Sequence, residues 1–202
     1  MPRSSAQNEA LRAATLEKVE AAAVALFAHR GYAATSMRDI AAEAGISTGL
    51  IYRHYATKDE LFGALVGQAA DGLRAVAEQL RAQPSPSTFV TAFARTFLAD
   101  IAAGAGFAEF YMIMNQAFTT PDAAPQVREL VQHHEEFVDG FVALVARGQR
   151  LGECRPGDPA DLVIVFLAAL SGIAMLAFSL GARAVLPGPQ ALTGIVLQRE
   201  SG

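Results

Sequence analysis

The sequence predicts an all-α fold, in which a small N-terminal three-helix domain precedes a larger helical bundle. The chain has 202 residues, of which 52% are hydrophobic and 18% charged, so a substantial core is expected. Apolar residues recur at intervals of three and four along most of its length, which is the spacing of one helix face. Alanine, the residue with the highest helix propensity, is abundant throughout.

Three helices are predicted within the first sixty residues. The first ends at Gly31, which suits the left-handed turn after a helix. The second begins at Thr35 or Ser36, with an acidic residue at capping-box spacing after Ser36, and it ends at Gly45. Ser47 offers a hydroxyl to cap the third helix, so only a tight turn separates the second helix from the third.

A long fourth helix leads into the bundle. Thr57 is its predicted cap, and the helix ends before the linker 83–87, where two prolines prevent it from continuing. The remaining helices are expected over residues 89–101, 107–118, 126–147 and 162–182, with a short last helix after Pro187.

Composition and charge narrow the classes of function. The single cysteine, Cys154, excludes an internal disulfide. The first twenty residues contain charges and no long apolar run, so we expect a cytoplasmic protein without a secretory signal. The net charge of −4 opposes indiscriminate binding to nucleic acid, so DNA binding has to be argued from a motif.

Residues 35–55 fit the helix-turn-helix motif, whose second helix enters the major groove of DNA. Ala41 is small where two helices must approach closely, and Gly45 can adopt the positive φ of the turn. Ile46 supplies an apolar anchor beneath that turn. Because short capped helices are common in helical proteins, this spacing alone leaves a purely structural role open.

Between Thr15 and Phe62 the chain contains the stretches ALFAHRGY (25–32), TSMRDIA (35–41), AGIS (44–47) and GLIYRHY (49–55), followed by Lys58. With these stretches, this part of the chain resembles the TetR (tetracycline-repressor) family. The remainder of the chain resembles the family only in helix count, in the loop 148–153 and in an apolar helix after Pro159. The resemblance implies a flexible N-terminal arm at 1–11, a DNA-binding domain at 12–60, and a ligand-binding and dimerisation domain at 61–202.

The same resemblance implies a set of DNA contacts. Thr35 and Ser36 would place a hydroxyl and the N-terminus of the second helix against a phosphate, and Lys58 would bind another phosphate. The positions at the start of the third helix would meet base edges, where a glycine permits close approach. The implied DNA-binding residues are Thr35, Ser36, Ser47, Thr48, Gly49, Leu50, Tyr52, Arg53, His54 and Lys58.

Two positions depart from the family pattern. Thr48 stands where lysine is frequent, and Leu50 stands where threonine is common. Leucine can touch a thymine methyl group but cannot hydrogen-bond, so the base preference of relatives does not carry over. Arg53 is the expected compensating charge. We expect Tyr55 to pack in the core and Tyr52 to remain available at the surface.

Eight of the twelve phenylalanines, together with Tyr111, lie within residues 89–141. An ordinary core explains such a density of rings, whereas the resemblance implies a ligand cavity among these helices. His134, on the apolar stripe of its helix, is either a core residue or orients an effector together with Tyr111 or Asn115. The ligand-binding residues expected are Phe93, Phe97, Phe110, Tyr111, Met114, Asn115, His134, Phe137, Phe141 and Leu170.

No motif supports metal binding or catalysis. The consecutive residues from His133 to Glu136 point about 100° apart on a helix and cannot converge on one ion. Cys154 has no histidine nearby in sequence, and no Gly-x-Ser-x-Gly elbow is present. We therefore expect no metal, no cofactor and no enzymatic activity.

The uncharged run 162–182 is long enough to cross a bilayer, so the alternative function is that of a membrane-associated helical protein with a span there. Ser171, Gly172 and many alanines dilute its hydrophobicity, and no basic flank accompanies it. A helix that is apolar all round is also typical of one buried between its own bundle and a second subunit. Ala168 and Gly172 would then let the two backbones approach.

Together these patterns predict a ligand-responsive DNA-binding transcriptional regulator. We expect a repressor that binds a pseudo-palindromic double-stranded operator as a homodimer, with half-sites about 34 Å apart. A small apolar or aromatic effector would release it. The homodimer would form through the 160–182 helix and the helix before or after it, without association with a membrane.

Overall fold

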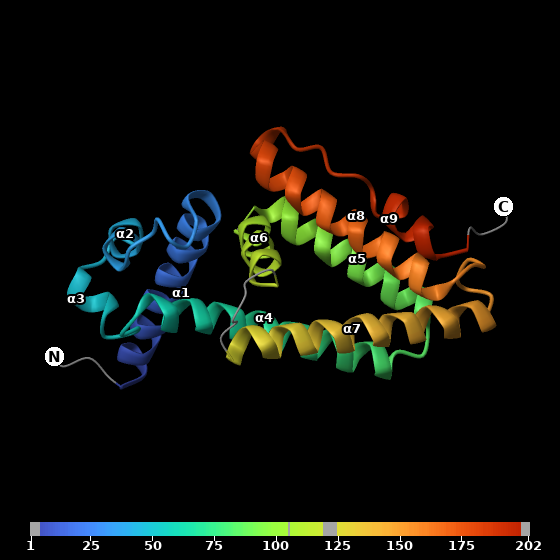
Figure 1. The fold of residues 1–202 in the computed structure, drawn as a ribbon, viewed down its shortest axis with the longest axis horizontal. Coiled ribbons are helices and arrows are strands. Elements are labelled where there is room, and N and C mark those ends of the chain that lie inside the picture. Colours follow the sequence, from blue (N-terminus) through green and yellow to red (C-terminus); the bar gives the residue numbers. More distant parts are fainter. Residues whose placement is uncertain (1–4, 105, 119–124, 199–202) are drawn as a thin grey trace.

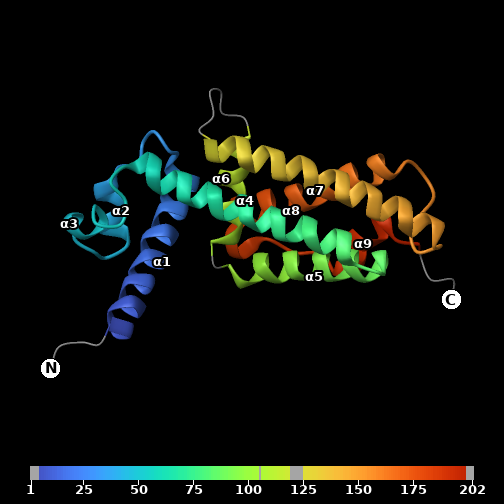
Figure 2. The same cartoon turned by 90° about the horizontal axis from the view of Figure 1, so that it is seen from below.

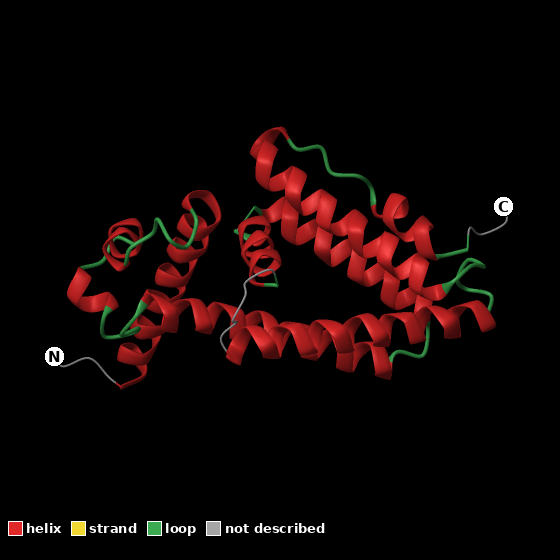
Figure 3. Cartoon of the chain, in the orientation of Figure 1, coloured by secondary structure: helices red, strands yellow, loops and turns green. Residues whose placement is uncertain are grey.

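The computed structural model describes residues 5–104, 106–118 and 125–198, which are helical without any β-sheet (Figures 1 and 3). The predicted all-α fold is confirmed. The elements are α1 (Ser5–Arg30), α2 (Met37–Glu43), α3 (Thr48–Ile51), α4 (Lys58–Ala82), α5 (Pro86–Ala103), α6 (Phe107–Ala117), α7 (Pro125–Arg150), α8 (Pro159–Leu180), the 3₁₀ turn η1 (Gly181–Arg183) and α9 (Pro189–Val196).

Side-chain caps begin the helices of the N-terminal domain where the sequence predicts them. Ser36 caps α2 by accepting a hydrogen bond from the backbone N–H of Asp39, and the Asp39 carboxylate accepts from the Ser36 N–H at 2.9 Å. Ser47 and Thr57 cap α3 and α4 by accepting from the backbone N–H three residues later, at 3.2 and 3.0 Å. These bonds satisfy N–H groups that have no partner within the helix.

The first helix is longer than expected. Residues 5–11, predicted to belong to a flexible arm, form the first two turns of α1, and residues 1–4 lie outside the described residues. The stretch AQNEALRAA contains alanine, leucine, glutamate, glutamine and arginine, all of high helix propensity, and no residue that stops a helix. The helix therefore extends N-terminally beyond its first buried residue, Val19.

The described residues form two hydrophobic cores, and α4 contributes to both. Figure 2 shows α4 running from the region of α1 to its position along α7. The N-terminal core joins α1, α2, α3 and the first half of α4 to parts of α6 and α7. The C-terminal core joins the second half of α4 to α5, α7, α8 and α9. On α4 the N-terminal core ends at Ala70 and the C-terminal core begins at Ala77, while Leu73 packs against both. The predicted boundary between residues 60 and 61 lies instead within the first turn of this continuous helix.

Hydrogen bonds connect the linker between α4 and α5 to the C-terminal end of α7 and to the loop after it. The Glu153 carboxylate accepts hydrogen bonds from the backbone N–H of Ser87 at 2.7 Å and from the Ser85 hydroxyl at 3.1 Å. These bonds hold the pKa of Glu153 below its usual value. Arg147 donates to the carbonyl of Gln83 in the same linker. The C-terminal end of α4 is therefore fixed to α7 and to the loop that follows α7.

Helix α8 is part of the bundle, although it alone among the described helices is, by itself, long and apolar enough to cross a membrane. One face, with Val163, Phe166 and Leu170, is buried in the C-terminal core, where α8 packs against α5, α6, α7 and α9. The opposite face leaves large apolar side chains exposed. They are Ile164, Val165, Met175, Leu176 and Leu180, hereafter the outer face of α8.

Candidate DNA-binding site

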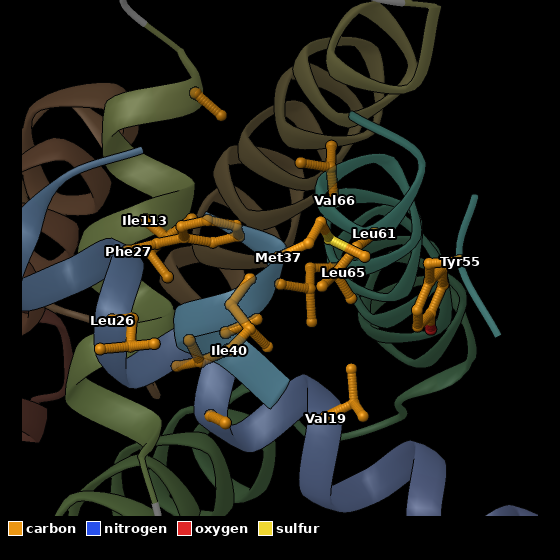
Figure 4. Packing of buried hydrophobic residues seen from close by; sticks show 14 of the residues in the cluster. Val19, Leu26, Phe27, Met37, Ile40, Tyr55, Leu61, Leu65, Val66 and Ile113 are labelled. Atoms are coloured by element: carbon orange, nitrogen blue, oxygen red, sulfur yellow. The ribbon is translucent and has the colours of Figure 1, made fainter. Parts of the chain in front are cut away.

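Helices α2 and α3 meet across a tight turn that the sequence anticipates. Gly45 adopts a φ of +67°, a conformation that favours glycine. The backbone N–H of Ile46 donates to the carbonyl of Ala41 at 2.9 Å, which closes the turn. Ile40 and Ile51 are fully buried in the N-terminal core. Figure 4 shows Ile40 among core residues of α1 and α4. One side of the helix pair is therefore fixed to the core, and the other side faces solvent.

The solvent side of α3 carries most of the residues predicted to read bases. Ser47, Thr48, Gly49 and Arg53 are exposed, and Tyr52 is 51% exposed despite its large ring. Tyr55, by contrast, is 7% exposed and belongs to the N-terminal core, as the sequence predicts. Regular α-helix ends at Ile51, and turns carry the chain on to Tyr55. The recognition segment, residues 47–55, thus presents hydroxyl groups, a phenol and a guanidinium on one surface.

Three of the predicted DNA contacts are partly or wholly buried within the chain. Thr35 is 2% exposed, and its hydroxyl donates to the carbonyl of Gly31 at 2.9 Å, so in this structure the hydroxyl is turned to the chain and not to solvent. The hydroxyl serves a carbonyl at the end of α1 that lacks a helical partner. Leu50 is half-buried, and the buried Nδ1 of His54 has no hydrogen-bond partner among the described residues.

Lys58 lies at the start of α4 and is tied to the loop after α1. Its Nζ donates to the carbonyl of Tyr32 at 2.7 Å and to that of Thr35 at 2.8 Å. The same ammonium lies 4.2 Å from the centroid of the Tyr32 ring, within the range of a cation–π contact. An ammonium has three N–H donors, so one remains for a phosphate. Lys58 therefore has a structural role that the sequence pattern did not reveal.

Arg38 is a further candidate contact that the sequence reasoning missed. It is exposed in the first turn of α2, two residues after the cap Ser36. Its charge, with that of Arg30, helps to lower the pKa of Asp39, after the larger effect of the hydrogen bonds from Ser36. A basic side chain in the first turn of the first motif helix is the signal that would have identified it. Arg38 is suited to a phosphate beside the recognition segment.

The residues predicted to bind a ligand divide between the two cores. Phe110 and Met114 of α6 pack with the N-terminal core. The rings of Phe93, Phe137 and Phe141 form one cluster in the C-terminal core with centroids 5.8–6.2 Å apart, the separation of rings in contact. The remaining large apolar residues of the set, Phe97 and Leu170, are buried in the same C-terminal core.

The polar members of that set do not converge on a common point. The hydroxyl of Tyr111 pairs with that of Ser171 on α8 at 2.8 Å, and the Asn115 amide donates to the Tyr111 carbonyl at 2.9 Å. The ring of His134 instead packs against Phe118, with centroids 4.9 Å apart. Burial lowers the pKa of His134. In this structure His134 has the surroundings of a core histidine.

An open groove lies elsewhere, between α5, α9 and the first turns of α8. Thr91 and Arg95 of α5, Asp161 of α8 and Thr193 of α9 are among its lining residues. None of the ten residues predicted to bind a ligand lines this groove. The groove thus mixes polar and charged groups, unlike the aromatic cavity that the sequence suggested.

The structure offers little for metal or thiol chemistry. Within the described residues, no group of three or more histidine, cysteine or acidic side chains is arranged to hold a metal ion. Cys154 is buried against Gly148, and burial raises the pKa of its thiol to about 11, so it remains protonated at neutral pH. A protonated, buried thiol is a poor nucleophile.

The fold and the exposed recognition segment define a class: an all-helical protein with a helix-turn-helix DNA-binding domain joined to a separate helical core. Residues 21–65 match the family model described as "Bacterial regulatory proteins, tetR family". This match confirms the resemblance to the TetR family seen in the sequence of these residues.

Individual proteins show the same likeness. The HTH-type transcriptional repressor Rv3405c of Mycobacterium tuberculosis is 58% identical over 45 residues, which are 22% of this chain and 24% of that repressor. The match thus spans about a quarter of that relative's length. The crystal structure of the MbdR regulator from Azoarcus sp. CIB has a TM-score of 0.70 at 19% identity, covering 89% of this chain and 93% of that one. AibR in complex with isovaleryl coenzyme A and operator DNA has a TM-score of 0.66 at 18% identity, covering 89% and 94%.

Proposed function

We propose that this protein is a transcriptional repressor that binds a double-stranded DNA operator through residues 47–55. The observation that carries the proposal is the two-sided character of residues 47–55: Ile51 is fully buried, whereas Thr48, Tyr52 and Arg53 are exposed to solvent. A helix fixed on one side and polar on the other can present its side chains to base edges in a constant orientation. Thr48, Tyr52 and Arg53 would read bases, and Ser36, Arg38 and Lys58 would hold phosphates.

A second copy of the chain completes the proposed DNA-binding unit. The outer face of α8 exposes a row of large apolar side chains, whose transfer out of water favours association. Ala168 and Gly172 are exposed on the same helix, and a Cβ on Gly172 would meet nothing within 4 Å, so a partner backbone has room to approach. A two-fold dimer would present two recognition segments to a pseudo-palindromic operator.

A small-molecule effector would act on the C-terminal core. The AibR complex shows that a protein of this fold has been captured with both an acyl coenzyme A and operator DNA. In this chain α4 runs from Lys58 in the DNA-binding domain to Leu80 in the C-terminal core (Figure 1). An effector that parts the rings around Phe93 and Phe97 would displace α4 and change the separation of the two DNA-binding domains.

The effector must bind the DNA-free conformation more tightly than the DNA-bound one, because equal affinity shifts no equilibrium. The variants His134→Ala and Tyr111→Phe test the expected ligand contacts. Reduced effector affinity in either variant supports a site among the rings. If effector affinity is unchanged in both variants but reduced in Arg95→Ala, the effector binds in the open groove between α5, α8 and α9.

A repressor of this kind catalyses no reaction, and it would act in the cytoplasm, where the operator DNA lies. Selection of bound duplexes from a random pool, with and without candidate effectors, tests the proposal directly. We expect a pseudo-palindromic consensus with half-sites about 34 Å apart. Purified protein that prefers no duplex over competitor DNA would overturn the proposed function.

A further inference from the structure

The residue that closes the recognition segment is held by a carboxylate on another helix. The hydroxyl of Tyr55 donates a hydrogen bond to Oε1 of Glu20, on α1, at 2.7 Å. The backbone N–H of Tyr55 donates to the carbonyl of Ile51, the last residue of α3, at 3.0 Å. Any shift of the Tyr55 side chain is therefore transmitted to α3 through a single turn.

The same carboxylate reaches a third helix. The side-chain amide of Gln68, on α4, donates to Oε2 of Glu20 at 2.9 Å. Glu20 thus uses one oxygen for the recognition segment and the other for α4, while its own backbone belongs to α1. Burial and the bond to Glu20 raise the pKa of Tyr55, so its hydroxyl remains a donor throughout the physiological range.

Packing alone does not require this hydroxyl. The Tyr55 ring lies in the N-terminal core beside Leu61 and Leu65 of α4 (Figure 4), and a phenylalanine ring would fill almost the same volume. A hydroxyl in such a place needs a partner, and a bond to a carboxylate is stronger and more directional than one between neutral groups. Apolar packing sets the depth of the ring, whereas the bond to Glu20 also sets its direction.

We propose that Glu20 is a positioning residue for DNA recognition, which fixes the C-terminal end of residues 47–55 against α1 and α4. Hydrogen bonds to base edges require donor–acceptor distances within a few tenths of an ångström, so a small rotation of α3 would weaken them. Contacts to phosphates through flexible side chains tolerate such a rotation. Loss of the Glu20 bond should therefore reduce sequence discrimination more than overall DNA affinity. This inference rests on the proposed DNA-binding function.

The test compares Glu20→Ala, Tyr55→Phe and the double variant on an operator selected with the unaltered protein, and on a scrambled duplex. All measurements are made at a temperature where circular dichroism shows each variant folded. We expect each single variant to lose about five- to tenfold in operator affinity, with scrambled-duplex affinity changed less than about twofold. The double variant should lose no more than either single one, because both remove the same bond.

Two further variants separate positioning from charge and from stability. Glu20→Gln retains a hydrogen-bonding group toward Tyr55 and should keep most of the discrimination. Glu17→Ala removes an equal charge from an exposed site on the same helix and should leave both affinities unchanged. Equal losses on both duplexes, or no loss on either, would show that Glu20 is not a positioning residue. If the unaltered protein itself discriminates between no duplexes, the DNA-binding function fails instead.

Discussion

Gly49 stands in the recognition helix at a position where the fold does not need a glycine. Its φ lies outside the left-handed region, and a Cβ built there would meet nothing within 4 Å. Glycine within a helix costs about 1 kcal/mol relative to alanine, so the residue weakens the short helix that carries it. Because the isolated chain gains nothing from this glycine, we infer that it allows the helix backbone to approach DNA closely.

The substitution Gly49→Ala should therefore separate stability from function. We expect the melting temperature to rise by a few degrees, since about 1 kcal/mol of helix propensity is gained. Operator affinity should fall about tenfold, because the added methyl group prevents close approach. Thermal unfolding and fluorescence anisotropy measure the two effects. Gly45→Ala is the matched control: at a φ of +67° it should lower the melting temperature. A Gly49→Ala protein that binds the operator normally would contradict this reasoning.

Lys58 illustrates how a sequence pattern can predict one role, phosphate binding, without indicating a second, structural one. As a phosphate contact, its replacement by alanine should weaken binding to all duplexes alike and reduce the slope of log K against log salt by about one. Because Nζ also donates to two carbonyls, we further expect a lower melting temperature. Salt titrations on operator and scrambled DNA measure the first effect. Thr48→Ala is the contrast, since it should change which sequences are selected and leave the salt slope unaltered.

The partial burial of His134 predicts that the stability of the protein depends on pH, whether or not His134 contacts an effector. Burial lowers its pKa below the usual value of 6.5, so the unfolded chain binds the proton more readily than the folded one. The free energy of unfolding should consequently decrease as the pH falls below about 6.5, until the folded state is protonated as well. Urea unfolding at pH 7.5 and pH 5.5 measures the decrease. His134→Gln should show a smaller decrease, and an identical one would assign the pH effect to other groups.

At the scale of single elements, the starts of α2, α3 and α4 were predictable because capping chemistry is local, whereas the uncapped start of α1 was not. Ser36, Ser47 and Thr57 lie within a few residues of the groups they satisfy, so sequence spacing identifies them. The tertiary contacts of Lys58 were not predictable, because its partners, Tyr32 and Thr35, belong to the loop after α1, whose path depends on packing. The division of α6 between two cores was hidden for the same reason. Phe110 and Phe107 lie three residues apart on one helix yet pack against different cores.

The end of α7 depends on a close approach that only glycine permits. A Cβ on Gly148 would overlap the Sγ of Cys154 and lie 3.1 Å from the Cβ of Pro86. Pro86 begins α5, and the backbone of Cys154 forms an isolated β-bridge with that of Leu197, after α9. The end of α7, the start of α5 and the segment after α9 therefore meet at this point. Gly148→Ala should destabilise the protein by about 1–3 kcal/mol, as overpacked cores do. Chemical denaturation measures the loss, and Gly152→Ala, in the adjoining turn with open space but a φ of +75°, gives the comparison for backbone strain alone.

At the scale of the whole molecule, α4 and α7 unite the two cores that the sequence had assigned to separate domains. Val127 of α7 belongs to the N-terminal core, and Phe141 of the same helix belongs to the C-terminal core. His29 at the end of α1 adds a direct link: its ring stacks on Phe178 of α8, and its Nε2 lies 3.6 Å from Glu109 of α6. A disturbance of α6 or α8 can therefore reach the DNA-binding domain through α1 as well as through α4.

A test of the proposed dimer also distinguishes two roles of α8, as a subunit interface or as a membrane segment. Leu176 is 58% exposed on the outer face of α8, and Leu151, in the turn after α7, is 57% exposed outside α8. Replacing Leu176 by aspartate buries a charge in the proposed interface, which costs far more than exposing it. We expect Leu176→Asp to be monomeric by sedimentation and to lose about a hundredfold in operator affinity, since one half-site then binds alone. Leu151→Asp should remain dimeric and bind normally. If Leu176→Asp is still dimeric, the subunit contact lies elsewhere. If the unaltered protein requires detergent to stay in solution, a membrane role for α8 is favoured instead.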